Sequence, residues 1–541
     1  MRAKLIAANL ALALAIAPYA FAQEPESERH HHHDGADSLG RVHFPVSCAA
    51  AVEPTFNRGM ALLYSFEYEA SQEAFAKASA ADPKCAMAKW GQAMSLYHQL
   101  WEPPSKENLQ RGEKLLAAAA KLKAPTAREQ EYISALTVFY TDTGKLDHEK
   151  RARAYSDAMR KVYEHNPQDQ EAAVLYSLSL LASSPPNDTE HTNDRAAVAI
   201  LSHLFDEQPA HPGIAHYIIH SCDNPSMAGL GLAAARKYAS IAPASAHAVH
   251  MPSHIFARLG LWQDDIQSNM KAIEIANQMG GMHLHVLHHK IHSLDFLIYA
   301  YLQVGDDASA KAMLDDINAV KQSELDPEYT DYAESAQAGF AATYAIERRQ
   351  WKDALALQPN PHASASYTQA SIYWGRAIAA GHLHDAAAAE AALKAYDEIL
   401  VATAKGSKPY IADYLKEERK VVQAWSLYAS GKTEEATKLL DEHADRQDKV
   451  GKGETSIPSR ELLADMLLES GKAQEALEQY EIALKTDPNR FNGLYGAARA
   501  AEQLQQNDKA ALYYAQLLKN CSGSQSDRPE LRQARMLVAA K

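Results

Sequence analysis

Apolar and small side chains recur with helical spacing along most of the chain, in pairs of segments separated by short turns. The clearest example lies near the C-terminus, where Ala476 and Tyr480 are followed 34 residues later by Ala510 and Tyr514. Gly471 marks the turn within the first of these units. A 34-residue helix–turn–helix period predicts an all-α structure in which each helix pair buries its apolar face only against its neighbours.

The same frame fits earlier parts of the chain. Gly260, Gly305 and Gly431 fall at predicted turns, and the segment 66–83 reads as the turn and second helix of another unit. This period, with its small, aromatic and proline landmarks, resembles the tetratricopeptide repeat (TPR). The resemblance implies a TPR-type helical-repeat superhelix, an α-solenoid.

Turn-forming stretches divide the predicted helices. We expect an N-terminal array over 46–357, an irregular connection over 358–410, and a C-terminal array over 411–541 that ends in a capping helix. Residues 23–45, which are acidic and contain the His30–His33 run, are expected to form a disordered leader.

The N-terminus has the features of a signal peptide. Arg2 and Lys4 precede a short apolar run and a small-x-small sequence that predicts cleavage after Ala22. The expected compartment is the periplasm, with secretion into the medium as the alternative. No other segment of the sequence approaches the roughly 20 apolar residues of a membrane span.

Charge and cysteine content exclude some functions. The formal net charge of −14 becomes more negative once residues 1–22 are removed, so nucleic acid is a poor partner. The four cysteines show no C-x-x-C spacing, which argues against a thiolate zinc site. Cys48 and Cys85 can close a disulfide across the first repeat, and four isolated thiols are the alternative. Hydrolases of the G-x-S-x-G and H-E-x-x-H designs are disfavoured because neither motif occurs.

Histidines and carboxylates cluster at positions of the repeat frame that, by the resemblance, face the concave groove of a TPR array. Pairs four residues apart lie on one helical face and can bind one ion. The sequence predicts a metal site, catalytic or not, with these candidate ligands: His216, His220, Asp223, His250, His254, His292 and Asp295. Further groove-lining candidates are His98, His247, Arg258, Tyr299 and Gln303.

Imidazole and carboxylate without thiolate suit Zn, Cu, Fe or Ni. The five histidines among the candidate ligands are expected to share one ion. Asp223 and Asp295 either bind this ion or accept the second N–H of a ligating imidazole. Pro252 either begins a helix, which leaves His247 and His250 in the preceding loop, or kinks one. Cys222 stands beside Asp223 and is a further candidate ligand. The alternative is that these histidines are ordinary packed or solvated residues.

Three segments, 86–94, 216–220 and 250–256, resemble a subgroup of exported bacterial TPR proteins. The resemblance covers about 44–305; it implies the fold and the compartment and assigns no chemistry. Two hypotheses follow. One is a metal-dependent protein, and the other is a scaffold that binds a peptide or protein without metal or catalysis. In either case the expected partner is a peptide, protein or small molecule in the concave groove.

Overall fold

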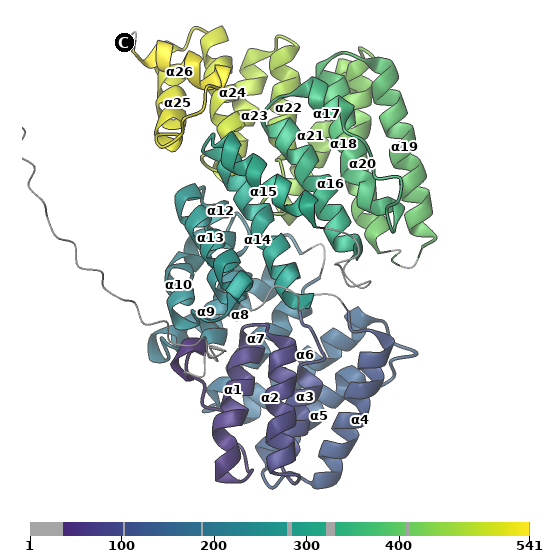
Figure 1. The fold of residues 1–541 in the computed structure, drawn as a ribbon, viewed down its shortest axis with the longest axis vertical. Coiled ribbons are helices and arrows are strands. Elements are labelled where there is room, and N and C mark those ends of the chain that lie inside the picture. The colour runs from purple at the N-terminus through teal and green to yellow at the C-terminus, as the bar shows by residue number, and fades with distance from the viewer. Residues whose placement is uncertain are drawn as a thin grey trace, which may run out of the picture. The chain divides into compact units, whose positions relative to one another are not determined.

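The computed structural model describes residues 36–100, 103–185, 188–278, 284–320, 330–406, 408 and 410–539. The predicted signal peptide 1–22 and the His30–His33 run lie outside the described residues. The described residues form α-helices and short 3-10 helices and contain no strand (Figure 1). The predicted all-α class is confirmed.

Helices follow one another through the N-terminal array, preceded by the 3-10 helices η1 (Ala36–Leu39) and η2 (Ala50–Val52). They are α1 (Glu53–Tyr64), α2 (Tyr68–Ala81), α3 (Ala86–Met94), α4 (Lys106–Leu122), α5 (Ala127–Tyr140), α6 (His148–His165), α7 (Gln170–Ala182), α8 (Thr192–Glu207), α9 (Pro212–Cys222), α10 (Ala228–Ile241), α11 (Ala246–His250), α12 (Pro252–Arg258), α13 (Trp262–Gln278), α14 (Leu284–Gln303), α15 (Asp307–Ala319), α16 (Thr330–Glu347) and α17 (Trp351–Ala356).

The remaining helices continue the same pattern to the C-terminus. They are η4 (Ser366–Gln369), α18 (Ala370–His382), α19 (Ala386–Ala404), α20 (Ile411–Ala429), α21 (Thr433–Val450), α22 (Ser459–Glu469), α23 (Ala473–Thr486), α24 (Phe491–Gln503), α25 (Asn507–Asn520) and α26 (Pro529–Ala539). The predicted irregular connection over 358–410 is therefore wrong for most of its length. Helices α18 and α19 contain Trp374 and Tyr396 but no proline landmark, and their alanine-rich faces form a helix pair.

Nearly every helix packs against the next helix in sequence, as expected of a helical-repeat solenoid. The predicted turns at Gly260, Gly305, Gly431 and Gly471 are confirmed, with φ values of +62°, +72°, +77° and +78°. At Gly260 a side chain is excluded twice, because φ is left-handed and a Cβ atom would lie 2.2 Å from the carbonyl oxygen of Pro488.

The segment just before α1 differs from the predicted disordered leader. The backbone N–H of Arg41 donates to the carbonyl of Ala210 (2.9 Å), and that of Ala244 donates to the carbonyl of Ser38 (3.1 Å). The ring of Phe44 is fully buried in the N-terminal core. Residues 38–44 therefore belong to the folded unit, because burial of this aromatic ring and main-chain pairing offset the cost of ordering them.

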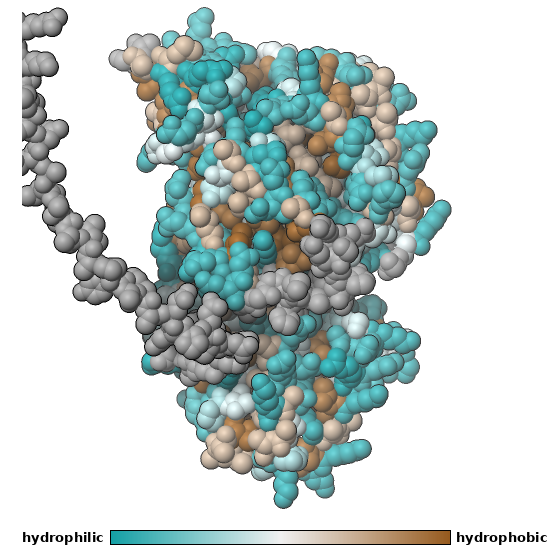
Figure 2. Space-filling model, in the orientation of Figure 1, coloured by the Kyte–Doolittle hydropathy of each residue, from teal (hydrophilic) through white to brown (hydrophobic). Residues whose placement is uncertain are grey.

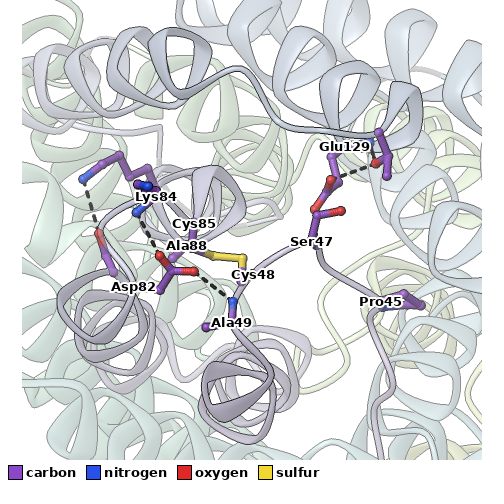
Figure 3. The surroundings of a disulfide bond; sticks show 12 residues. Pro45, Ser47, Cys48, Ala49, Asp82, Lys84, Cys85, Ala88 and Glu129 are labelled. Atoms are coloured by element: carbon purple, nitrogen blue, oxygen red, sulfur yellow. Dashed lines mark hydrogen bonds between the residues drawn. A yellow bond between two sulfur atoms is a disulfide. The ribbon is translucent and has the colours of Figure 1, made fainter.

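A disulfide joins Cys48 to Cys85 (Figure 3). Beside it, the N–H of Ala49 donates to Asp82 (2.9 Å), so the chain before α1 is held against the end of α2. Cys222 and Cys521 are free thiols, and both are buried.

The two predicted arrays contact each other through a buried cation. The guanidinium of Arg490, at the start of α24, donates to Glu461 on α22 (2.7 and 2.9 Å), to Glu347 on α16 (2.6 Å) and to the hydroxyl of Tyr299 on α14. Its side chain is only 1% exposed. These pairings hold α22 and α24 of the C-terminal array against α14 and α16 of the N-terminal array.

Hydrophilic residues cover much of the face seen in Figure 2, with apolar residues scattered among them. Within the described part of the chain, no helix combines the length and apolar character needed to cross a bilayer.

Candidate metal centre

Six histidines gather where the helices α9, α11, α12 and α14 meet. α12 packs against α9, and both α11 and α12 pack against α14. The ligand atoms form two groups, which we call the first trio (His216, His220 and His247) and the second trio (His250, His254 and His292). Within each trio the ligand atoms lie within 4.8 Å of one another.

The Nε2 atoms face one another in both trios. In the first, Nε2 of His216 lies 3.0 Å from Nε2 of His220 and 3.0 Å from Nε2 of His247. In the second, Nε2 of His254 lies 3.1 Å from Nε2 of His250 and 3.4 Å from that of His292. Nitrogen ligands about 2.0–2.1 Å from a tetrahedral ion lie about 3.3 Å apart, so both trios have near-ligating spacing.

Pro252 begins the helix α12 without leaving the histidines before it in a loop. It stands at the N-terminal position of α12, and Met251 connects α12 to the five-residue helix α11. His247 and His250 therefore lie on a short helix and not in a loop. They are three residues apart, and His247 contacts a histidine of α9 while the ring of His250 contacts His292 of α14.

Acceptors on the other ring nitrogen fix the imidazoles of His216 and His250. Nδ1 of His216 lies 2.6 Å from the carbonyl oxygen of Tyr64, which can only accept. Nδ1 of His250 lies 2.6 Å from Oδ1 of Asn269, whose amide nitrogen donates to Asp265 (2.7 Å). In both rings Nδ1 therefore carries the proton and Nε2 presents a lone pair to its trio, as in metal-binding histidines.

Burial keeps most of these imidazoles neutral. It lowers the pKa of His216 and of His292 to about 3, and with neighbouring imidazoles it lowers the pKa values of His220, His247 and His250 well below the ordinary value. Neutral imidazole is the ligating form. Five of the six rings are thus in the protonation state that a metal ion requires.

His254 differs because carboxylates contact it. Its Nδ1 lies 2.8 Å from Asp223 and 2.7 Å from Glu454. Burial lowers the pKa of His254, but the two carboxylates outweigh it and raise the pKa to about 10. Without an ion, an imidazolium at His254 donates from Nε2 to His250; an ion bound at Nε2 would displace that proton.

The carboxylates are themselves held in place by Arg258. Its Nε donates to Asp223 (3.0 Å), and its Nη2 donates to the carbonyl of Lys452 (2.7 Å). Burial and the nearby Glu454 raise the pKa of Asp223. Burial would also raise the pKa of Glu454, but a hydrogen bond from Asp223 and the cations His254 and Arg258 hold it well below its usual range. Asp223 therefore lies where it can orient His254, which is one of the two roles predicted for the aspartates from the sequence.

Glu454 is the residue that sequence analysis missed. It lies in the segment 451–458 between α21 and α22, 200 positions from His254. That segment reads as a polar break in the repeat pattern and carries no periodic signal. Only its three-dimensional contact with His254 reveals a role.

Several predicted site residues lie apart from both trios. Asp295 accepts from Thr455 (3.0 Å), and burial raises its pKa to about 7. His98 stacks on the ring of Tyr68, with centroids 4.4 Å apart. Cys222 belongs to neither trio, and burial raises the pKa of its thiol to about 12, which disfavours the ligating thiolate.

The predicted groove residues of α14 contact other parts of the fold. The hydroxyl of Tyr299 donates to the carbonyl of Ser456 (3.2 Å), and Gln303 accepts from the backbone N–H of Phe491 (2.9 Å). Arg258 likewise donates to the carbonyl of Lys452, so these three side chains contact C-terminal segments of the fold.

Two cavities adjoin the trios. One of about 590 Å³ is lined by His220 and His247 of the first trio and by His254 and His292 of the second, together with apolar side chains such as Met251. Another of about 300 Å³ is lined by His220, Asp223 and Arg258. Both trios therefore border a space large enough for a small molecule.

Comparison with known families gives the character of the repeats. The tetratricopeptide repeat family model matches residues 56–127 and 462–524. These two segments match tetratricopeptide repeats. These TPR segments flank the six histidines without including them, so the match does not assign the trios a role.

No curated protein matches the chain. Solved structures similar to it include Naa15/Naa10 bound to HypK-THB (11% identity, covering 90% of this chain and 73% of that one, TM-score 0.24). The TPR domain of P58(IPK) is 14% identical (91% and 99% covered, TM-score 0.22). The human IFIT1 dimer with m7Gppp-AAAA is 12% identical (84% and 90% covered, TM-score 0.34).

Proposed function

We propose that this TPR protein binds a transition-metal ion through Nε2 of His250, His254 and His292. The observation that carries the proposal is the convergence of three imidazole nitrogens at near-ligating distances in a buried site, with acceptors on Nδ1 of His250 and His254. Carboxylate on one histidine and amide on another form the outer hydrogen bonds typical of metal-binding imidazoles.

Three protein ligands leave a position of a tetrahedral ion open, which is typical of catalytic sites and not of structural ones. His254 and His292 border the cavity of about 590 Å³, so that position can face a small molecule. The ligand set suits Zn, Cu, Fe or Ni. We propose metal-assisted chemistry on a small molecule in this cavity.

The proposed compartment is the periplasm, with residues 1–22 as the signal peptide. The Cys48–Cys85 disulfide supports it, because disulfides persist in oxidising compartments. The acidic net charge argues against nucleic acid as a partner.

A second candidate function is a scaffold that binds a peptide or protein. The TPR matches at 56–127 and 462–524 support it, since such repeats commonly present binding surfaces. Contacts that occupy Arg258, Tyr299 and Gln303 weigh against a peptide groove at that part of the array.

The test is metal analysis of the full chain with the four histidines of 30–33 replaced by serine, which removes an exposed source of bound metal. After dialysis against Zn²⁺ and then buffer, elemental analysis should find stoichiometric metal. The double variant His250→Gln/His292→Gln should lose the ion of the second trio, whereas His443→Gln, a buried histidine on α21, should keep it. If the parent protein with serine at 30–33 takes up neither Zn²⁺ nor Cu²⁺ stoichiometrically, the proposal is refuted and the scaffold is preferred.

A further inference from the structure

We infer that the first trio binds a second transition-metal ion, so that His216, His220 and His247 complete a two-ion centre. The inference rests on the proposed function, because the same chemistry is assigned to a neighbouring set of side chains. The sequence pattern predicted one shared ion and left His247 outside the ligand set.

The number of lone pairs on His216 favours a cation in the first trio. Its Nδ1 proton is directed at the carbonyl of Tyr64 (2.6 Å), so Nε2 offers one lone pair. Two other Nε2 atoms, of His220 and His247, each lie 3.0 Å from it. One in-plane lone pair cannot accept two good hydrogen bonds, whereas a single ion accepts a lone pair from each of three nitrogens.

The surroundings of the first trio favour neutral ligands. The ring of Phe66 lies 4.4 Å from that of His216 and 5.5 Å from those of His220 and His247, measured between centroids. The ring of Tyr238 stacks on His216 at 5.1 Å. Aromatic walls of this kind disfavour protonated imidazole and leave the three nitrogens available to a metal ion.

Proximity makes the two trios one centre. Ring centroids of His220 and His254 lie 6.2 Å apart, and those of His247 and His250 lie 6.3 Å apart. Both trios border the same cavity of about 590 Å³. A small molecule in that cavity can therefore reach ions bound at both trios.

The experiment uses Cu²⁺ as the probe, because it stands highest in the affinity series for nitrogen ligands and is paramagnetic. The full chain with serine at 30–33 is loaded, dialysed, and measured by elemental analysis and electron paramagnetic resonance. We expect two copper ions per chain, with a resonance broadened by coupling between neighbouring ions.

Matched variants assign the ions. His216→Gln/His247→Gln should hold one ion with an uncoupled spectrum, and so should His250→Gln/His292→Gln, while His443→Gln should keep two coupled ions. Retention of one ion by each double variant, with an unchanged helical circular dichroism spectrum, shows that the fold survives.

Three results overturn the inference. If the parent protein with serine at 30–33 holds one ion and only the second-trio variant loses it, the second site is removed and the proposed function stands. Two ions that survive the first-trio variant, or that show no coupling, would place the second ion elsewhere. Protein without any stoichiometric ion would refute the inference together with the proposed function.

Discussion

Replacing Asn269 by leucine tests whether the outer hydrogen bonds set metal affinity. Asn269 holds Nδ1 of His250 at 2.6 Å and is itself oriented by Asp265. Leucine has a similar volume and no acceptor. Without the acceptor, the proton of His250 can move from Nδ1 to Nε2, the atom that faces His254. A metal ion would then have to displace that proton before it could bind.

The expected size follows from the groups that remain. Loss of an outer partner typically costs about 10–100-fold in metal affinity. The hydroxyls of Ser253 and Ser293 each lie 3.4 Å from Nδ1 of His250 and can partly replace the amide. We therefore expect a loss near the lower limit, about 10-fold or about 1.4 kcal/mol.

The assay is competition for Zn²⁺ against a chromogenic chelator, with the fold checked by circular dichroism. Ser268→Ala is the control, because Ser268 lies on the same helix and donates to the carbonyl of Val249 (2.6 Å) without touching a trio ring. Unchanged affinity in folded Asn269→Leu would show that His250 does not depend on this hydrogen bond or is not a ligand.

Three further predictions concern stability. Arg490→Met should lower the free energy of urea unfolding by about 3–5 kcal/mol, because it leaves two buried carboxylates without their cation; a loss below 1 kcal/mol would contradict the burial of this network. In metal-free protein, the free energy of unfolding should fall as pH drops from about 6.5 towards 3, because His216 and His292 are protonated in the unfolded chain before they are in the folded protein. If replacing either histidine by glutamine does not change the shift in urea midpoint between pH 7.5 and lower pH, this prediction is wrong. Cys48→Ser should lower the free energy of unfolding by about 3–4 kcal/mol, because the unfolded chain is no longer constrained by the disulfide to Cys85. A reducing agent should then have no further effect on the variant.

Repeat periodicity was enough to predict the helices and their turns. Ala476 and Tyr480, and their counterparts Ala510 and Tyr514, are all buried as the 34-residue spacing requires. The sequence pattern failed over 370–404, where the alanine-rich helices lack the proline landmark, and over 38–44, where burial of Leu39 and Phe44 orders the segment. The buried face of a helix can be predicted from residue spacing. The ordering of a segment by contacts with residues far away in the sequence cannot.

For the histidines, spacing predicted the gathering and not its division. His216, His220, His250, His254 and His292 do meet, as the frame predicted. The division follows the helices that carry them, because His216 and His220 lie on α9 whereas His250, His254 and His292 lie on α11, α12 and α14. How these helices pack against one another is not specified by the sequence pattern. Whether ions occupy the trios stays a prediction.

The segment 451–458 also bears on how the chain unfolds. Repeat arrays held together only by neighbours can lose their ends in steps, since each unit depends on the adjacent one. Here His254 contacts Glu454, and Asp295 contacts Thr455, across 200 and 160 positions of sequence. Such long-range closures couple the middle of the chain to its later repeats, so these repeats should melt in one cooperative transition and refold more slowly than an array built from local contacts.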